Sequence, residues 1–257
     1  MPPAAAPRQP SPAGTLATAA PPHGRALRGC EVCRRWEGVA LCADCLDRFA
    51  APRPRCARCG LALGVAAPAC GHCLREAPPF AATVCAFDYA FPWDRLIAEF
   101  KFNARPELAR PLAQRLLQAL NEAGAVEGAG LAGAARPDVL LPVPLAPARL
   151  AERGYNQAWE LARELARALA LPADATLLQR PADGAHQAQL TRDERRRNLR
   201  GAFLVDPLRR GELAGRHVAL VDDVMTTGAT LREAAVALLR AGAASVSAWV
   251  LARTPDD

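Results

Sequence analysis

The chain has 257 residues, more than most single domains, and its composition changes along its length: cysteine and proline concentrate in the early part, and an ordinary α/β composition follows. No apolar run approaches the roughly eighteen residues of a membrane-spanning helix, which excludes a protein built on such helices. The net charge of +6 favours polyanionic partners, and a phosphorylated sugar or a nucleic acid would both fit.

Residues 1–28 are rich in proline and alanine and lack the compact apolar core of a secretory signal. This composition predicts a disordered lead-in. A cytoplasmic location is then the default expectation. Reducing conditions there favour metal-bound thiolates over disulfides.

Residues 29–78 contain four CxxC pairs, and eight, ten and ten residues separate consecutive pairs. The two sulfurs of one CxxC pair can point at a single ion, and two pairs complete the tetrahedral shell that Zn²⁺ prefers. We therefore predict two zinc sites of four cysteines each, whose metals are structural. The first site is formed by Cys30, Cys33, Cys42 and Cys45, and the second by Cys56, Cys59, Cys70 and Cys73.

Two alternatives to this metal assignment stay open. The pairs can also combine in a crossed order, first with third and second with fourth. Sites of four cysteines also hold iron–sulfur clusters, although the tight cysteine runs of bacterial ferredoxins are absent from the sequence. The ninth cysteine, Cys85, lies in the apolar segment TVCAFDYAF and is predicted to be buried in a strand.

Residues 79–254 show strand and helix patterns in alternation, which predicts an α/β domain with a parallel sheet. Ligands of such sheets bind beyond the carboxyl ends of the strands. The predicted strands are 83–90, 138–143, 217–222 and 245–251, and the predicted helices are 92–102, 105–120, 155–169 and 229–243.

The segment VALVDDVMTTGAT, residues 218–230, combines a buried strand, two carboxylates, a short turn and a helix start. Free N–H groups and the dipole at a helix start favour a phosphate, and glycine lets the backbone approach it closely. Asp222 and Asp223 can accept hydrogen bonds from ribose hydroxyls and help to hold Mg²⁺. The predicted phosphate-binding residues are Thr226, Thr227, Gly228, Ala229 and Thr230.

The segment lacks the residues that other phosphate-binding motifs require. A P-loop needs a lysine within GxxxxGKS or GxxxxGKT, and a dinucleotide fold needs GxGxxG after its strand. A phosphatase of the haloacid dehalogenase type needs two aspartates with one residue between them, whereas Asp222 and Asp223 are adjacent. A capped turn without any ligand remains the alternative, but it does not require two carboxylates and three threonines together.

Lys101 is the only lysine in a chain rich in arginine. A lysine retained where arginine otherwise serves suggests a place that needs a compact ammonium, although chance is the alternative. Lys101 is therefore a candidate ligand-binding residue.

VALVDDVMTTGAT resembles the signature of type I phosphoribosyltransferases. Together with the CxxC pairs, PVPLAPARLAERGYNQA (142–158) and QAQLTRDERRRNLRGAF (187–203), it makes the chain similar, over about residues 30–253, to the competence protein ComF family, which includes the GntX-like proteins. The resemblance implies a double zinc ribbon joined to a phosphoribosyltransferase-like domain that binds phosphoribosyl pyrophosphate (PRPP) with Mg²⁺.

The resemblance also assigns roles to the two other segments. Residues 142–158 correspond to a pyrophosphate loop, in which arginines hold the leaving diphosphate and polar neighbours bind substrate or orient those arginines. A surface turn with solvated arginines is the alternative. The residues concerned are Arg149, Arg153, Asn156 and Gln157. Residues 187–203 are predicted to be a mobile flap that contributes Gln189 and Arg196.

Two functions from different classes follow. As an enzyme, a magnesium-dependent phosphoribosyltransferase, the chain transfers the ribosyl phosphate of PRPP to an unknown nitrogen acceptor. As a binding module, it senses PRPP, while the zinc region and the basic flap contact single-stranded DNA or a DNA-uptake protein. The family name links the chain to natural transformation by resemblance alone.

Overall fold

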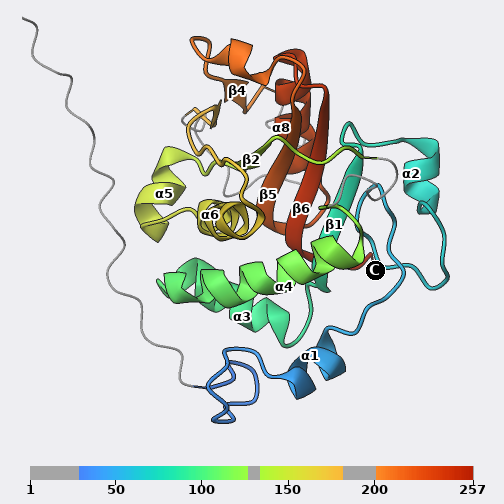
Figure 1. Cartoon of the computed structure of the whole chain (residues 1–257), viewed down its shortest axis with the longest axis vertical. Helices are drawn as coiled ribbons and strands as arrows, with labels where there is room; N and C mark the ends of the chain where they lie inside the picture. The colour runs from blue at the N-terminus through green and yellow to red at the C-terminus, as the bar shows by residue number, and fades with distance from the viewer. Residues whose placement is uncertain (1–28, 127–133, 182–200, 257) are drawn as a thin grey trace, which may run out of the picture.

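The computed structural model describes residues 29–126, 134–181 and 201–256 (Figure 1). Its centre is a parallel sheet of four strands in the order β1-β6-β5-β2. The strands are β1 (Ala82–Asp88), β2 (Val139–Pro142), β5 (His217–Met225) and β6 (Ser245–Arg253). All four carboxyl ends therefore lie at the same edge of the sheet. The predicted parallel α/β fold is confirmed.

The two central strands are longer than predicted. Strand β5 continues past both aspartates to Met225, which pairs with Arg253 at the end of β6. The predicted end of this strand at residue 222 was wrong because β6 supplies ladder partners beyond the aspartates. The turn that follows is consequently short and contains only residues 226–228.

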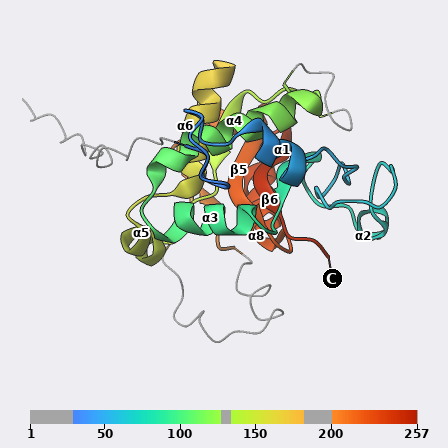
Figure 2. The same cartoon turned by 90° about the horizontal axis from the view of Figure 1, so that it is seen from below.

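Three helices cover one face of the sheet (Figures 1 and 2). They are α3 (Trp93–Phe102), α4 (Ala109–Glu122) and α6 (Gln157–Leu169). Their buried residues, such as Ile97, Leu116 and Leu161, share one core with alternate residues of the strands. A single helix was predicted over 105–120, but a 3-10 turn, Pro106–Leu108, precedes α4. Pro111 then falls in the first turn of α4, where its missing N–H removes no helical hydrogen bond.

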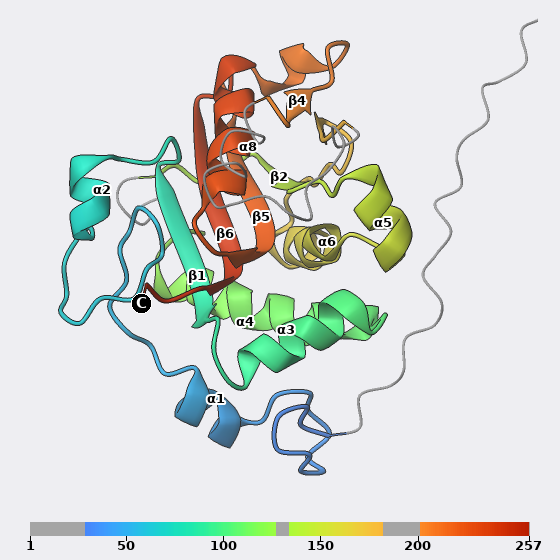
Figure 3. The same cartoon turned by 180° about the vertical axis from the view of Figure 1, so that it is seen from behind.

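The opposite face carries α8 (Ala229–Arg240), which Figure 3 shows in front of the central strands. Leu231 and Leu238 of this helix pack with Leu220 and Val250 in a second core. An antiparallel pair of short strands, β3 (Leu178–Gln179) and β4 (Leu204–Val205), and the 3-10 turn Arg210–Leu213 lie near α8. These elements were not predicted because two-residue strands carry no readable periodicity.

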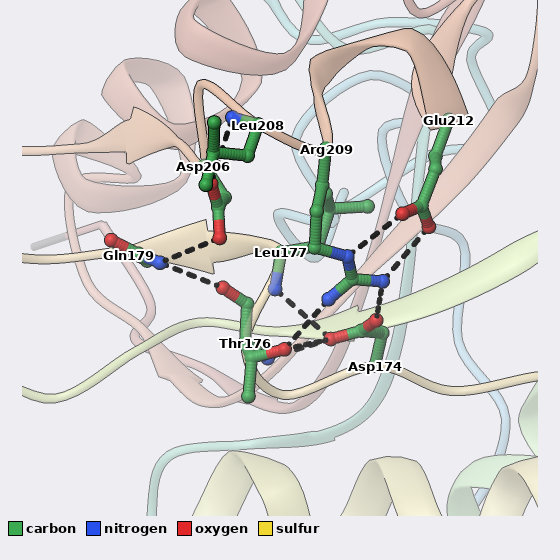
Figure 4. A network of polar contacts seen from close by, with 8 residues as sticks. All are labelled: Asp174, Thr176, Leu177, Gln179, Asp206, Leu208, Arg209 and Glu212. Carbon is green, nitrogen blue, oxygen red and sulfur yellow. Dashed lines mark hydrogen bonds and ion pairs between the residues drawn. The ribbon is translucent and has the colours of Figure 1, made fainter. Parts of the chain in front are cut away.

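A polar network holds the base of the β3–β4 pair (Figure 4). The Asp174 carboxylate accepts hydrogen bonds from the backbone N–H groups of Thr176 and Leu177 and forms an ion pair with Arg209 at 2.5 Å. Arg209 also pairs with Glu212 at 2.8 Å. Although burial opposes ionisation of Asp174, the guanidinium and the N–H groups lower its pKa to about 2. The network joins the segments on either side of residues 182–200.

The two cysteine-rich segments, residues 30–49 and residues 56–75, pack on different parts of this core. In the first, which includes α1 (Ala43–Phe49), the Phe49 carbonyl accepts a hydrogen bond from the Trp93 indole at 2.8 Å, and Glu31 pairs with Arg105 at 3.0 Å. In the second, which includes α2 (Gly71–Arg75), the Ala57 carbonyl accepts a hydrogen bond from the N–H of Thr83 on β1 at 2.9 Å. The second segment shares the core of α8.

Gly60 lies close to β1, where a side chain would have little room. Its φ is +70°, and an added Cβ would lie 3.0 Å from Cγ2 of Thr83 and 3.3 Å from Cβ of Cys85. We expect Gly60→Ala to lower the free energy of unfolding by about 1–3 kcal/mol more than Gly38→Ala, because overpacking adds to backbone strain. Urea unfolding of the metal-loaded proteins measures the difference.

Gly38 is the matched control because its φ is +69° and a Cβ there meets nothing within 4 Å. Equal losses in the two variants would show that the contact with β1 contributes nothing.

Candidate functional site

The paired aspartates lie near the carboxyl end of β5, where Asp223 is 7% exposed. Its Oδ1 atom is 2.9 Å from Nζ of Lys101, whose side chain is 16% exposed. The N–H of Asp223 donates a hydrogen bond of 2.9 Å to Oδ1 of Asp222. The structure thus brings together three predicted site residues from α3 and β5.

The charges of Asp222, Asp223 and Lys101 do not cancel. Burial and the neighbouring Asp223 carboxylate raise the pKa of Asp222 to about 7, although Lys101 and Arg153 act in the opposite direction. Two carboxylates with one close ammonium leave a surplus of negative charge when both are ionised. The site is therefore suited to a cation or to hydroxyl donors.

The position of Lys101 depends on the segment that was predicted to bind pyrophosphate. Lys101 lies in the last turn of α3, and its carbonyl accepts a hydrogen bond from Nε2 of Gln157 at 3.3 Å. The Tyr155 hydroxyl donates to the carbonyl of Phe100 one residue earlier. These two contacts join the end of α3 to the start of α6. Sequence reasoning did not assign Tyr155 this role, since the contact spans distant parts of the chain.

The other residues of that segment have local roles as well. A short helix, α5 (Pro147–Arg153), ends at Gly154 with φ +77°, and Asn156 caps α6 by accepting a hydrogen bond from the N–H of Ala158 at 2.9 Å. The Asn156 amide also donates to the carbonyl of Val143 at 3.1 Å. Such capping satisfies a free N–H group of the helix start and fixes the turn.

The two arginines of this segment differ. Nη1 of Arg153 donates to Oε1 of Gln157 at 3.1 Å, and its guanidinium lies over the Phe102 ring, 5.1 Å from the centroid. Arg149 is exposed on α5 and forms no hydrogen bond or ion pair with the described residues. Diphosphate binding by either arginine stays a prediction. Gln189 and Arg196 lie outside the described residues.

The predicted phosphate loop connects β5 to α8. Gly228 is the N-cap of α8 with φ +74°, and an added Cβ there would lie 2.5 Å from Cε of Met225. The Thr227 hydroxyl accepts a hydrogen bond from the N–H of Ala229 at 3.3 Å, whereas Thr226 is exposed. Gly228 therefore permits both the left-handed turn and the close packing on Met225.

The end of β6 borders this loop and was missed by sequence reasoning. The N–H of Thr254 donates to the carbonyl of Met225 at 3.0 Å, and Arg253 is 7% exposed. A signal was present: residues 252–254 follow an apolar strand pattern whose carboxyl end must lie at the same edge as Asp223.

The eight cysteines of the CxxC pairs form two groups in which the sulfur atoms lie within 4.8 Å of one another. Their membership confirms the consecutive arrangement: Cys30, Cys33, Cys42 and Cys45 in the first group, and Cys56, Cys59, Cys70 and Cys73 in the second. Four sulfurs at such separations can hold a metal ion.

One thiol in each group ionises easily. Burial opposes ionisation, but nearby backbone N–H groups stabilise the thiolate and lower the pKa to about 6 for Cys30 and about 7 for Cys56. Burial raises the pKa of Cys59 to about 11. A metal ion that binds such a group therefore displaces protons from the remaining thiols.

Cys85 lies apart from both groups, as predicted. It is buried in β1, its thiol donates to the carbonyl of Phe87 at 2.8 Å, and burial raises its pKa to about 11. Such a thiol is unreactive.

None of the helices in the described part of the chain has the length and apolar character that a membrane span requires.

A family model, the phosphoribosyl transferase domain, matches residues 151–257, which include the aspartates and the loop to α8. Similar folds include the allosteric regulatory enzyme of purine biosynthesis, with a TM-score of 0.37 and 22% identity over 60% of this chain and 29% of that chain. Residues 151–257 therefore match a phosphoribosyltransferase domain.

Relatives identify the family more closely. The DNA utilization protein YhgH of Escherichia coli (strain K12) is 37% identical over 214 residues, which cover 83% of this chain and 90% of that protein. Competence protein F of Haemophilus influenzae is 36% identical over 213 residues, with the same coverage. Competence protein ComFC of Bacillus subtilis is 38% identical over 45% of each chain. The chain belongs to the competence protein F and YhgH family.

Proposed function

We propose that the chain binds PRPP with Mg²⁺ at the carboxyl end of β5. The observation that carries the proposal is the pair Asp222 and Asp223 near the end of β5, two residues before a tight turn whose Gly228 is the N-cap of α8. The turn and the first N–H groups of α8 take the 5-phosphate, and the carboxylates take the ribose hydroxyls and Mg²⁺. The match to a phosphoribosyltransferase domain supports this ligand.

As an enzyme, the chain transfers ribosyl phosphate to a nitrogen acceptor. The nitrogen lone pair bonds to C1 of the ribose, the C1–O bond breaks, diphosphate leaves with the bonding electrons, and the nitrogen's proton passes to solvent. Positive charge develops on the ribose ring, so the Asp223 carboxylate stabilises that state electrostatically. In this proposal the Arg153 guanidinium binds the diphosphate. Mg²⁺ supplies further neutralisation of the leaving charge.

Replacing both carboxylates tests the ligand assignment. We expect Asp222→Asn with Asp223→Asn to weaken Mg-dependent PRPP binding by about a hundredfold or more, because two charge-assisted contacts are lost. Isothermal titration calorimetry of the metal-loaded chain measures the affinity. Asp44→Asn with Asp47→Asn makes the same charge change at exposed positions and should bind as the unaltered chain does. Unchanged affinity in the first variant would refute the site.

A measurement of diphosphate release distinguishes a transferase from a protein that only binds PRPP. The chain is incubated with PRPP, Mg²⁺ and a panel of bases and amines. Release that depends on an acceptor establishes transfer, whereas tight PRPP binding without release establishes the binding module.

Both cysteine groups are proposed to hold Zn²⁺ as structural sites, because four thiolates leave no open position for water. We expect two zinc ions per chain, one in each four-cysteine group, and we expect Cys73→Ser to retain one. Cys85→Ser is the matched control and should retain both, since a serine hydroxyl can also donate to the Phe87 carbonyl. Elemental analysis gives the counts. Iron in place of zinc, which would colour the protein, would overturn the assignment.

A second candidate function, single-stranded DNA binding, is favoured by Trp36, which is 77% exposed in the first cysteine segment. The neighbouring Arg34 and Arg35 side chains are 67% and 56% exposed. Arg34 pairs with Glu31, and Arg35 pairs with Glu37 and Asp44. An exposed indole beside these arginines suits base stacking next to a phosphate backbone. The names of the relatives, a DNA utilization protein and competence proteins, point in the same direction.

Trp36→Ala is expected to weaken binding of a single-stranded oligonucleotide about tenfold or more, because stacking contributes about 1–3 kcal/mol per base. Fluorescence anisotropy at several salt concentrations measures the affinity. Val65→Ala, which changes a side chain that is 75% exposed in the second cysteine segment, should have little effect. Absence of measurable affinity even at low salt would exclude the DNA role.

A further inference from the structure

The first cysteine segment holds helix α3 at both of its ends. At the start of α3, the Trp93 indole donates a hydrogen bond of 2.8 Å to the carbonyl of Phe49. Beyond the end of α3, the Arg105 guanidinium donates two hydrogen bonds, of 3.0 Å and 3.1 Å, to the carboxylate of Glu31. The segment lies beside α3 on the side away from the sheet (Figures 1 and 3). The position of α3 therefore depends on a segment that contains four cysteines.

Glu31 and Arg105 form an ion pair of low exposure. The Glu31 side chain is 8% exposed and that of Arg105 is 18% exposed. A bidentate pair of guanidinium and carboxylate fixes the orientation of the two segments as well as their separation. Arg105 also donates a hydrogen bond of 3.0 Å to Glu99 within α3. The pair therefore links the position of Glu31 to the end of this helix.

The position of Glu31 depends in turn on the first metal group. Glu31 directly follows Cys30, a member of that group. The core of the segment is small: it consists of three buried cysteines, against which Val32 and Phe49 pack. A segment with so few apolar contacts depends on its metal for a folded structure. The metal therefore fixes the backbone that presents Glu31 to Arg105.

The end of α3 carries a residue of the candidate site. Lys101 lies in the last turn of α3, between Glu99 and Arg105 in the sequence, and its Nζ is 2.9 Å from Oδ1 of Asp223. Gln157 at the start of α6 holds the same turn independently, through the carbonyl of Lys101. Loss of the contact with the cysteine segment would thus loosen Lys101 without removing all of its support.

We propose that Glu31 and Arg105 are positioning residues, which couple the first metal group to Lys101 and thereby set the affinity of the site for PRPP. A positioned ammonium offsets the carboxylates of the site, whose negative charge otherwise repels a polyanionic ligand. The inference rests on the proposed function for the identity of the ligand. The coupling between the cysteine segment and α3 is independent of it.

Glu31→Gln tests the coupling because it removes one charge of the pair and preserves the size of the side chain. Calorimetry of the full metal-loaded chain measures Mg-dependent PRPP affinity, and hydrogen exchange at the backbone N–H groups of residues 100–104 reports on the end of α3. We expect PRPP binding to weaken about fivefold or more, as is typical of coupled sites, and exchange to become faster.

Glu37→Gln is the matched control, because Glu37 lies in the same segment and pairs with Arg35 instead of with α3. It should behave as the unaltered chain does in both measurements. Arg105→Gln breaks the Glu31 pair from outside the cysteine segment. It should reproduce both effects of Glu31→Gln with the metal content unchanged by elemental analysis.

A double-mutant cycle distinguishes positioning from a general loss of structure. In a Lys101→Met chain, Glu31→Gln should weaken PRPP binding no further, because the group through which Glu31 acts is absent. An undiminished effect of Glu31→Gln in that chain would overturn the proposal. Equal PRPP affinity in the Glu31→Gln and Glu37→Gln chains would overturn it as well.

Hydrogen exchange keeps the two proposals separable. If the unaltered chain binds no PRPP, the proposed function fails, and exchange at residues 100–104 alone decides the coupling. Faster exchange in the Glu31→Gln chain than in the Glu37→Gln chain would then support the coupling of the cysteine segment to α3, and equal exchange would refute it.

Discussion

The parallel pairing of β5 with β6 is the constraint on which the candidate site depends. Because the ladder continues to Met225 opposite Arg253, the aspartates are held by backbone hydrogen bonds on a rigid strand. The same pairing places the end of β6 beside the turn into α8. A loop would have to lose conformational freedom to present these groups, whereas a central strand presents them already ordered.

Charge adds a second constraint. An ammonium and two carboxylates lie within a region of low exposure, and removing charges from water is costly unless each has a partner. Lys101 offsets only part of that cost, and its own place is set by the contacts of Gln157 and Tyr155 with the end of α3. Three separate stretches of chain therefore determine the electrostatics of the site.

The sequence predicted what local patterns encode. Alternating strand and helix patterns predicted the parallel sheet, and the spacing of the CxxC pairs predicted the membership of both cysteine groups. It did not predict α5 or the β3–β4 pair, which are too short to show periodicity. The sequence also did not predict the contact between Arg253 and Cys59, because these residues are 194 positions apart in the chain. Lys101 was noticed only for its rarity, and its distance from Asp223 required the fold.

The contact of the second cysteine segment with β1 has a consequence for solubility. β1 is one of the two edge strands of the sheet, and the Ala57 carbonyl accepts a hydrogen bond from the N–H of Thr83 where another strand would otherwise add. Unpaired strand edges recruit further chains by edge-to-edge pairing. Unfolding of this segment therefore uncovers a template for self-association, and the segment protects the sheet in the way that a terminal capping repeat protects a repeat protein.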